Sequence, residues 1–371
     1  MLPGIGAPAA APGPGRDSRV GILDGTRSVD GDARIRVALR TLRDSVVQSP
    51  LRDGLLAAAS VVPALLAKAY ARRPDLAPRT GRVWEAAGVL PVPYHFYQPV
   101  VRPSAVAEWG VEDPLIGVDL RVDAQLRLLV RLEKFAAEVP TAAVGSRAGG
   151  GAAFDYSNVS FKSGDAEALY GMVRLFHPAR VVEVGAGHST RMIRHALDAN
   201  ARDGHDSSHT IIEPYPKPWL AGLGAQEIVR ERVERTDTRR FEDLAENDIL
   251  FIDTSHVVRL GGDVLHLYLH VIPSLRPGVL VHMHDVFLPR DYPREWAADQ
   301  KKFWTEQYLL QAFLGFNSQF EVLLALAYLS QHRHDELCRA CPVYATEPGR
   351  VPGSFWMRRV AADPPLSSTS A

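Results

Sequence analysis

The sequence predicts an α/β protein in which a mostly parallel, doubly wound sheet follows a helical N-terminal extension. Three observations lead to this fold class. From about residue 180 onward, short apolar runs typical of buried strands alternate with helical patterns. The first of these runs, 180–184, ends at a turn with two glycines. The last two runs, 320–326 and 354–360, have no convincing helix between them, which indicates a closing antiparallel pair.

The N-terminal part of the chain predicts three segments of different character. Residues 1–18 are mostly Pro, Gly and Ala, so we expect a disordered tail. Residues 19–150 form the helical extension, which contains the strongly apolar helix 55–71 and ends in a glycine-rich linker at 146–154. The sheet domain then occupies residues 151–371. The aromatic cluster 94–97 either packs the extension onto the sheet or forms a wall of a substrate pocket.

Composition and charge narrow the classes of partner and compartment. The formal net charge of -1 offers no electrostatic attraction for nucleic acid or an anionic membrane, so we expect neither partner. No apolar run approaches the roughly 18 residues of a membrane span, and no signal-like segment begins the chain. Two neighbouring cysteines do not make a disulfide framework, which favours a cytoplasmic protein. The oligomeric state stays open, a homo-oligomer included.

The first strand and its turn carry the earliest functional signal. Three β-branched valines within 181–184 suit a central strand, and Gly185 and Gly187 then let the backbone come close to a ligand. A dinucleotide fingerprint requires a third glycine, but Thr190 stands there. Glu183 instead lies two residues before the first glycine, and Ser189 or Thr190 can cap the helix that follows. This turn therefore favours a nucleotide-type ligand other than a dinucleotide.

Later strands end in polar groups at the edge where parallel sheets bind their ligands. The second strand, 209–214, contains Glu213, which is suited to accept both hydroxyls of a ribose. The fourth strand ends in Asp253 and His256, and the fifth ends in His284 and Asp285. Because His has a pKa near working pH, His256 is the best candidate for a general base. The same side chains could also form a simple network that orients loops.

The order of four motifs, VEVGAGHST, IIEP, LFIDTSH and VLVHMHD, resembles the class I S-adenosylmethionine-dependent methyltransferases. Within that class the chain is similar, from about residue 158 onward, to the macrocin and mycinamicin sugar O-methyltransferases. The resemblance implies a Rossmann-like sheet of seven strands with the last one reversed. It also implies S-adenosylmethionine bound by the following residues: Glu183 near the methionine part, Gly185, Gly187, Ser189, Glu213 at the ribose, and Asp237 beside the adenine.

The resemblance further implies O-methylation of a small-molecule acceptor with the help of a divalent metal, Mg²⁺ or similar. Asp253 matches the first metal-binding acid of that branch, Asp285 matches the second acid of its later pair, and His256 matches the general base. His284 replaces the first acid of the pair. Since imidazole suits zinc, manganese or iron better than magnesium, we expect a divalent metal on Asp253, His284 and Asp285 and leave its identity open among these ions.

Two other functions stay open alongside this one. In a hydroxylase-like relative, Asp253, His256 and His284 would bind iron as a facial triad. A non-catalytic partner protein would keep only the cofactor pocket.

A second cluster of metal-ligand types lies near the C-terminal end, at His332, His334, Cys338 and Cys341. Its spacing does not match common zinc sites, so ordinary reduced thiols are the favoured interpretation.

Overall fold

The computed structural model describes residues 50–139, apart from 74, 76, 93, 107 and 108, and residues 154–360. The chain divides into two compact units, Met1–Gln98 and Pro99–Ala371. The predicted tail at 1–18 and the expected domain boundary at 150/151 lie outside the described residues. Residues 99–139, which we assigned to the extension, belong to the second unit.

Among its described residues, the first unit contains the helices α2 (Pro50–Arg72) and α3 (Pro78–Ala86). Our expectation that no apolar run approaches the length of a membrane span is wrong. Within the described part of the chain, Asp53–Arg72 is one helix of 20 residues that is long and apolar enough for a span, and none of it is buried. In the sequence, Pro63 and Lys68 interrupt the apolar stretch. In the structure, the helix continues through both residues. One such helix does not by itself establish a membrane protein.

The predicted aromatic cluster also lies in the first unit. Phe96 stacks on His95 with ring centres 4.2 Å apart, and its ring is 81% exposed. Neither interpretation of this cluster, as packing surface or as pocket wall, is decided by these contacts.

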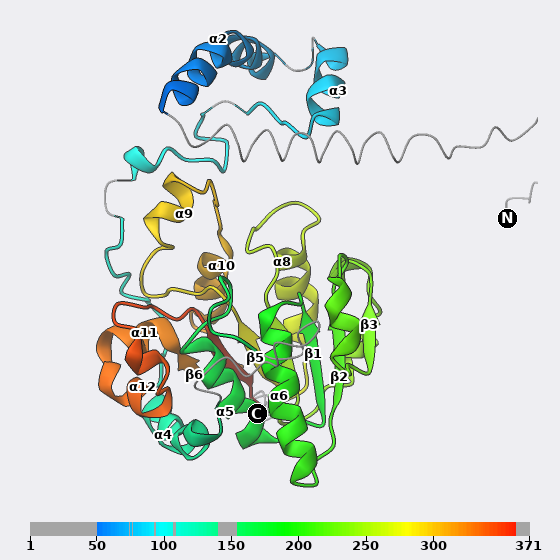
Figure 1. Cartoon of the computed structure of the whole chain (residues 1–371), viewed down its shortest axis with the longest axis vertical. Helices are drawn as coiled ribbons and strands as arrows, with labels where there is room; N and C mark the ends of the chain where they lie inside the picture. Colours follow the sequence, from blue (N-terminus) through cyan, green and yellow to red (C-terminus); the bar gives the residue numbers. More distant parts are fainter. Residues whose placement is uncertain are drawn as a thin grey trace, which may run out of the picture. The chain divides into compact units, whose positions relative to one another are not determined.

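The second unit is built on one seven-stranded sheet with the strand order β3-β2-β1-β4-β5-β7-β6 (Figure 1). Strands β1 to β5 run parallel to one another, and β7 is antiparallel to both β5 and β6. This confirms the predicted fold class, including the reversed last strand. The strands are β1 (Arg180–Val184), β2 (Ser208–Ile212), β3 (Glu227–Val229), β4 (Ile249–Ile252), β5 (Leu280–Met283), β6 (Phe320–Ala325) and β7 (Phe355–Arg359).

Helices cover both faces of this sheet. They are α4 (Val122–Leu132), α5 (Asp165–Phe176), α6 (His188–Arg202), α7 (Arg239–Glu242), α8 (Asp263–His266), α9 (Arg294–Ala298), α10 (Glu306–Leu314), α11 (Leu326–His332) and α12 (His334–Ala340). The last two correct our expectation that no convincing helix separates the final strands. Short 3-10 segments join these elements, and a π-helical turn at Leu267–Val271 continues α8.

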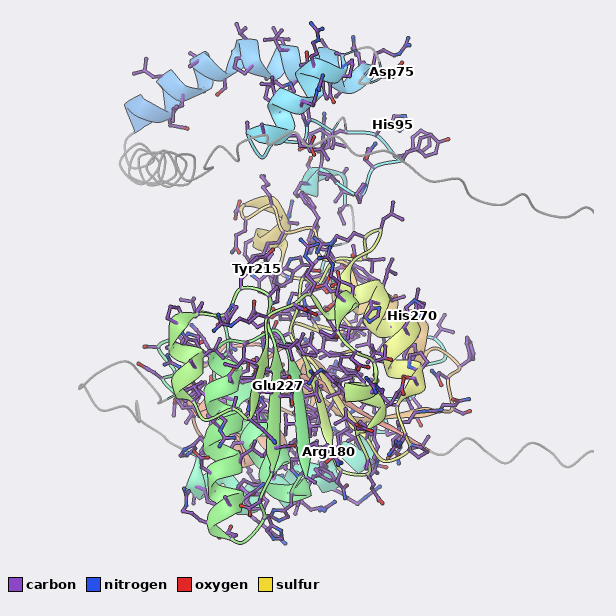
Figure 2. All side chains as sticks on the ribbon, turned by 90° about the vertical axis from the view of Figure 1, so that its right-hand side faces the viewer. Asp75, His95, Arg180, Tyr215, Glu227 and His270 are labelled. Carbon is purple, nitrogen blue, oxygen red and sulfur yellow. The ribbon has the colours of Figure 1, made fainter. Side chains whose placement is uncertain are left out.

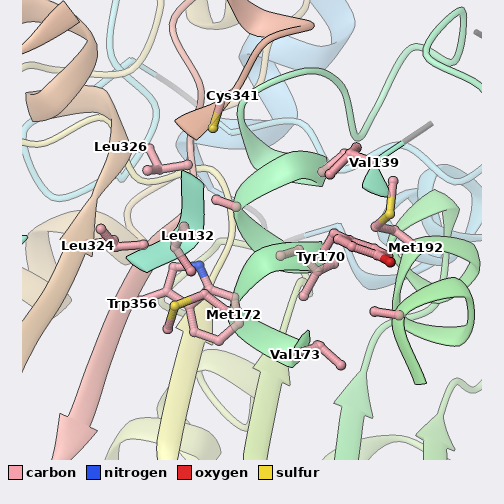
Figure 3. Packing of buried hydrophobic residues seen from close by; sticks show 14 of the residues in the cluster. Leu132, Val139, Tyr170, Met172, Val173, Met192, Leu324, Leu326, Cys341 and Trp356 are labelled. Carbon is pink, nitrogen blue, oxygen red and sulfur yellow. The ribbon is translucent and has the colours of Figure 1, made fainter. Parts of the chain in front are cut away.

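The sheet separates two hydrophobic clusters because successive side chains of a strand point to opposite faces. On one face, Val181, Phe251 and Trp356 pack under α4, α5 and α6 (Figure 3). On the other face, Val182 and Ile252 pack against the π-helical turn and α10. Figure 2 labels Arg180, which begins β1, and Tyr215, which follows β2, at opposite ends of the sheet. The end near Tyr215 is the carboxyl edge, where the candidate site lies.

Candidate functional site

The glycine turn after β1 is fixed by its contact with the end of β4. Gly185 has a φ of +85°, and a Cβ at this position would lie 1.8 Å from the backbone oxygen of Asp253. Only glycine fits there. Gly187 differs, because no atom lies within 4 Å of the corresponding point. The turn therefore needs its first glycine for packing and leaves open space above its second.

Glu183 and Ser189 lie beneath this turn and not at its surface. The fully buried carboxylate of Glu183 accepts hydrogen bonds from Ser189 Oγ at 2.8 Å and Thr190 Oγ1 at 2.9 Å. Its other oxygen lies 3.0 Å from His209 Nε2 on β2. The structure thus places Glu183 as a link between two strands and the start of α6, which begins at His188.

A cavity of about 250 Å³ opens beside the turn. Glu213 borders it, with Oε2 accepting from the Ala186 backbone N–H at 3.2 Å and Oε1 accepting from that of Tyr215 at 2.7 Å. Its lining residues come from the ends of β1, β2 and β4 and from two loops: Val184, Gly185, Ile212, Glu213, Pro214, Tyr215, Arg232, Val233, Glu234, Asp253, Thr254, Arg259 and Asp263. We call it the cofactor cavity.

Asp237 does not line the cofactor cavity. It pairs with Arg239 on the surface, where Arg239 Nε lies 3.0 Å from Asp237 Oδ2. Hydrogen bonds from Arg239 lower the pKa of Asp237 to about 2. Arg232 and Glu234, from the same loop region, line the cavity instead, and the sequence analysis did not single them out.

Asp253, His256 and Asp285 come together at the ends of β4 and β5. His256 Nε2 lies 3.2 Å from Asp253 Oδ1 and 3.6 Å from Asp285 Oδ2. On its other side, His256 Nδ1 lies 2.9 Å from Oε2 of the buried Glu306, at the start of α10. Both His256 and Asp285 have a φ of +57°, a conformation that non-glycine residues rarely adopt and that clusters at functional sites.

His284 joins the same cluster from β5. Its Nδ1 lies 3.7 Å from Asp253 Oδ2 and 3.5 Å from Asp285 Oδ2, and its Nε2 lies 3.8 Å from Asp165 Oδ2. Both ring nitrogens are buried and form no hydrogen bond. Asp165 is held by the Ser354 backbone N–H at 2.7 Å. The sequence analysis missed Asp165 and Glu306, which begin helices far along the chain from the strand ends.

The carboxylates dominate the electrostatics of this cluster. Burial opposes the protonation of His256, yet Asp253 and Glu306 together raise its pKa to about 10. Burial likewise opposes the protonation of His284, and Asp285 and Asp253 raise its pKa well above the usual value. His256 is therefore a cation at neutral pH, and the same carboxylates favour the protonated form of His284.

The donor set fits a divalent cation. Asp253, His256 and Asp285 each offer one ligand atom, and these atoms lie within 4.8 Å of one another. Ligand atoms at right angles around an ion, each about 2.1 Å from it, lie about 3 Å apart, close to the separations seen here. His284, with two unpartnered buried nitrogens, supplies a further imidazole beside the same carboxylates. The two predicted acids, Asp253 and Asp285, therefore lie about as close to His256 as to His284.

A second cavity, of about 480 Å³, adjoins the cluster from the β5 and β7 side. Asp285, His284 and Asp165 lie at its wall, whereas Asp253 borders the cofactor cavity. We call it the acceptor cavity. Its lining combines charged, aromatic and glycine residues: Val159, Ser160, Lys162, Asp165, His284, Asp285, Phe287, Arg290, Asp291, Pro293, Glu295, Trp296, Gln331, Gly349, Arg350, Val351 and Gly353.

The His and Cys cluster near the C-terminal end is not a metal site in the structure. His334 lies between Tyr344 and Cys338, with Nδ1 3.1 Å from the Tyr344 hydroxyl and Nε2 3.4 Å from Cys338 Sγ. His332 pairs with Glu112 and Cys341 is buried near the Gly164 backbone oxygen, so only His334 and Cys338 of the four side chains lie in contact. Both cysteines are free thiols.

Comparison with known proteins bears on the class of this site. Residues 182–286 match the family model described as a methyltransferase domain, less than a third of the chain. The match begins in β1 and ends one residue after Asp285, so it includes the glycine turn and the residues Asp253, His256, His284 and Asp285. Together with the observed strand order, it supports a class I S-adenosylmethionine-dependent methyltransferase.

Individual relatives are distant. A protein of Archaeoglobus fulgidus described as uncharacterized is 27% identical over 191 residues, covering 44% of this chain and 78% of that protein. The crystal structure of a candidate methyltransferase from Thermobifida fusca YX has 14% identity and a TM-score of 0.34, covering 67% of this chain and 97% of that one.

A third similarity is to 1,6-didemethyltoxoflavin-N1-methyltransferase from Burkholderia thailandensis, whose structure contains 1,6-didemethyltoxoflavin and S-adenosylhomocysteine. It has 16% identity and a TM-score of 0.26, covering 68% of this chain and 94% of that one. At these TM-scores neither solved structure bears on the substrate of this chain.

Proposed function

We propose that this protein transfers the methyl group of S-adenosylmethionine to a hydroxyl of a small molecule. One observation carries the proposal: the cofactor cavity and the acceptor cavity meet at the same cluster, with Asp253 at one and Asp285 at the other. Methyl transfer requires a donor carbon and an acceptor oxygen held about 3 Å apart in line. Two adjoining cavities with acid and base groups between them suit this requirement.

Glu213 and Gly185 would hold the cofactor. The Glu213 carboxylate is fixed by two backbone N–H groups at the cavity edge, so it is positioned to accept the two ribose hydroxyls. Gly185 lets the turn pack tightly against the end of β4, so that its backbone forms part of the cavity wall. Arg232 and Glu234, at the far part of the cavity, replace Asp237 as our candidates for the adenine region. Glu183 and Ser189 act indirectly, by fixing the start of α6.

His256 would take the proton from the acceptor hydroxyl. Glu306 accepts from Nδ1, which leaves Nε2 directed at Asp253 and Asp285, the acids that border the two cavities. The neighbouring carboxylates keep this imidazole protonated in the metal-free protein, so it acts as a base only when part of their charge is neutralised.

A divalent metal bound by Asp253, Asp285 and the imidazole of His284 would supply that neutralisation, leave His256 Nε2 free to act as the base, and lower the pKa of the acceptor hydroxyl. The imidazoles favour manganese, iron or zinc alongside magnesium.

The acceptor cavity favours a polar small molecule. Lys162, Arg290 and Glu295 border it together with Trp296 and Phe287, a mixture that suits a hydroxylated ring. The resemblance of the four motifs to the macrocin and mycinamicin sugar O-methyltransferases also favours a hydroxylated acceptor. We also place the protein in the cytoplasm, where its two free thiols would remain reduced.

Thermal unfolding tests the central claim. S-adenosylhomocysteine at about a hundredfold excess over its Kd should stabilise the protein by about 2.7 kcal/mol, a Tm rise of a few degrees. Addition of Mn²⁺ or Mg²⁺ should raise Tm further in the wild type and not in Asp253→Ala. Absence of any shift with S-adenosylhomocysteine would reject the proposed cofactor. A cofactor shift with no response to either metal would reject metal assistance and, with it, the neutralisation that lets His256 act as a base.

A further inference from the structure

We propose that a second ligand site lies at the opposite edge of the sheet and binds a phosphate group carried on an apolar body. The site is a cavity of about 280 Å³ between α4 and the β6/β7 edge, which we call the arginine cavity. Four arginines contribute to its lining together with apolar side chains, and the lining surface is mostly apolar. The lining residues are Arg121, Ala124, Arg127, Leu128, Arg131, Phe176, Val322, Leu323 and Arg358.

The arginine cavity is separate from the methyl-transfer site. Arg358 pairs in register with Leu280, the first residue of β5, whereas the catalytic cluster follows the last residue of that strand. Phe176 ends α5, just before the chain enters β1. Both therefore mark the amino edge of the parallel strands. In Figure 1, α4 lies beside α12 and α5, which it contacts, and away from the carboxyl edge.

Two of the four arginines already share one acid. Arg121 and Arg358 both contact Glu321 on β6, with Arg358 Nε 2.7 Å from Glu321 Oε1. One carboxylate thus balances two guanidinium groups, and the lining of the cavity itself contains no acid.

The other two arginines, Arg127 and Arg131, are exposed and one helical turn apart on α4. Neither forms an ion pair with any residue that the structure describes. Arg131 lies over the Phe176 ring, 5.8 Å from its centre. The acids that follow on this segment have other partners, since Glu133 binds Arg339 and Glu138 binds Arg174. A chain with a net charge of -1 therefore concentrates unpaired positive charge at this cavity.

The number and type of free cations favour phosphate over carboxylate. Guanidinium groups donate paired N–H bonds that match phosphate oxygens, and a phosphate dianion can neutralise both free arginines. A monocarboxylate would leave one of them unbalanced.

The apolar floor adds a second requirement. The lining residues Ala124, Leu128 and Leu323 have no polar side-chain atom. Inorganic phosphate alone would therefore leave this apolar surface in contact with water. A cavity of about 150 Å³ accommodates benzene, so this volume has room for a ring and a phosphate.

Calorimetric titration of the full-length protein tests the proposal, with phenyl phosphate, inorganic phosphate and benzoate as probes. We expect saturable binding that is tightest for phenyl phosphate. The double variant Arg127→Gln/Arg131→Gln should weaken phenyl phosphate at least about tenfold, because two charge-assisted contacts are lost. Both side chains are solvent-exposed and Gln is a good helix former, so the fold should persist.

A charge-matched control separates a site from diffuse attraction. Arg202→Gln/Arg276→Gln removes two exposed arginines that do not line the cavity, and it should leave binding unchanged. Equal weakening in both double variants, or no saturable binding of phenyl phosphate in the wild type, would overturn the proposal.

A second variant tests the apolar floor. Ala124→Met should fill part of the cavity and remove the preference for phenyl phosphate over inorganic phosphate while all four arginines remain. An unchanged preference would contradict the assigned ligand class. Vesicles containing phosphatidic acid identify the source of the phosphate: vesicle binding that is lost in the arginine double variant supports the site with a lipid as its ligand. Binding of soluble phenyl phosphate alone supports a soluble metabolite.

Discussion

Glu306→Gln tests how the buried acid controls His256. The substitution keeps an oxygen that can accept from His256 Nδ1, at 2.9 Å in the native protein, and removes the negative charge. A charge-assisted hydrogen bond contributes about 1.5–3 kcal/mol and a neutral one about 1 kcal/mol. The imidazolium should lose the difference, roughly 1–2 kcal/mol. At about 1.4 kcal/mol per pKa unit, the His256 pKa should fall from about 10 by about one unit.

The same change alters the pH dependence of stability. The folded-state pKa of His256, about 10, lies above the ordinary histidine value near 6.5. Its protonation therefore stabilises the folded state fully below about pH 6.5, and this contribution is lost as pH rises through the folded pKa. In Glu306→Gln the contribution should be smaller, and its loss should finish about one pH unit earlier.

NMR titration of the imidazole signals and urea unfolding, both from pH 6 to about 11 and with EDTA present, provide the measurement. Glu242→Gln, an exposed acid on α7, is the matched control and should leave both curves unchanged. A His256 pKa that stays the same or rises in Glu306→Gln would refute the assigned contact.

Two further predictions concern the cofactor cavity. Gly185→Ala should lower the free energy of unfolding by at least about 2 kcal/mol in urea, because the added Cβ would lie 1.8 Å from the Asp253 backbone oxygen. Gly187→Ala is the control and should change this free energy by less than about 1 kcal/mol, because its Cβ faces open space. Equal losses in the two variants would contradict the geometry. Glu213→Gln should weaken S-adenosylhomocysteine about tenfold in calorimetry, because hydrogen bonds to a charged acceptor contribute more than neutral ones. Asp237→Asn is its control, and a comparable loss there would restore Asp237 as a cofactor residue.

The sequence was most informative about the strands and their order. Apolar runs bounded by turn residues located all seven strands, and their spacing predicted the parallel arrangement. The helices α11 and α12 were missed for a physical reason. Helix α11 begins directly after β6, so the apolar run continues from strand to helix without a turn residue to separate them. Helix α12 carries His334 and Cys338, and we interpreted this stretch by its metal-ligand residue types and not by its helical spacing.

Residues near the ends of neighbouring parallel strands could be predicted to meet, and Asp253, His256 and Asp285 do. Glu306 could not, because it comes from a helix about 50 residues further along the chain, with no motif of its own. Glu183 shows the opposite case. Val181 lies in the cluster beneath α5 and α6, and Glu183, two residues later, points to that same face of the sheet. Strand alternation thus predicts that Glu183 supports the helix.

Charge balance connects the unusual backbone of this site to its proposed chemistry. Four buried or half-buried carboxylates, of Asp165, Asp253, Asp285 and Glu306, face the two imidazoles and the guanidinium of Arg350. With both imidazoles protonated, one negative charge remains in excess, and the protein additionally holds His256 and Asp285 in a left-handed conformation that costs about 1 kcal/mol or more each. Such an arrangement is unfavourable for stability alone. It is favourable for binding a dication, which would balance the acids and allow one imidazole to release its proton and act as a base.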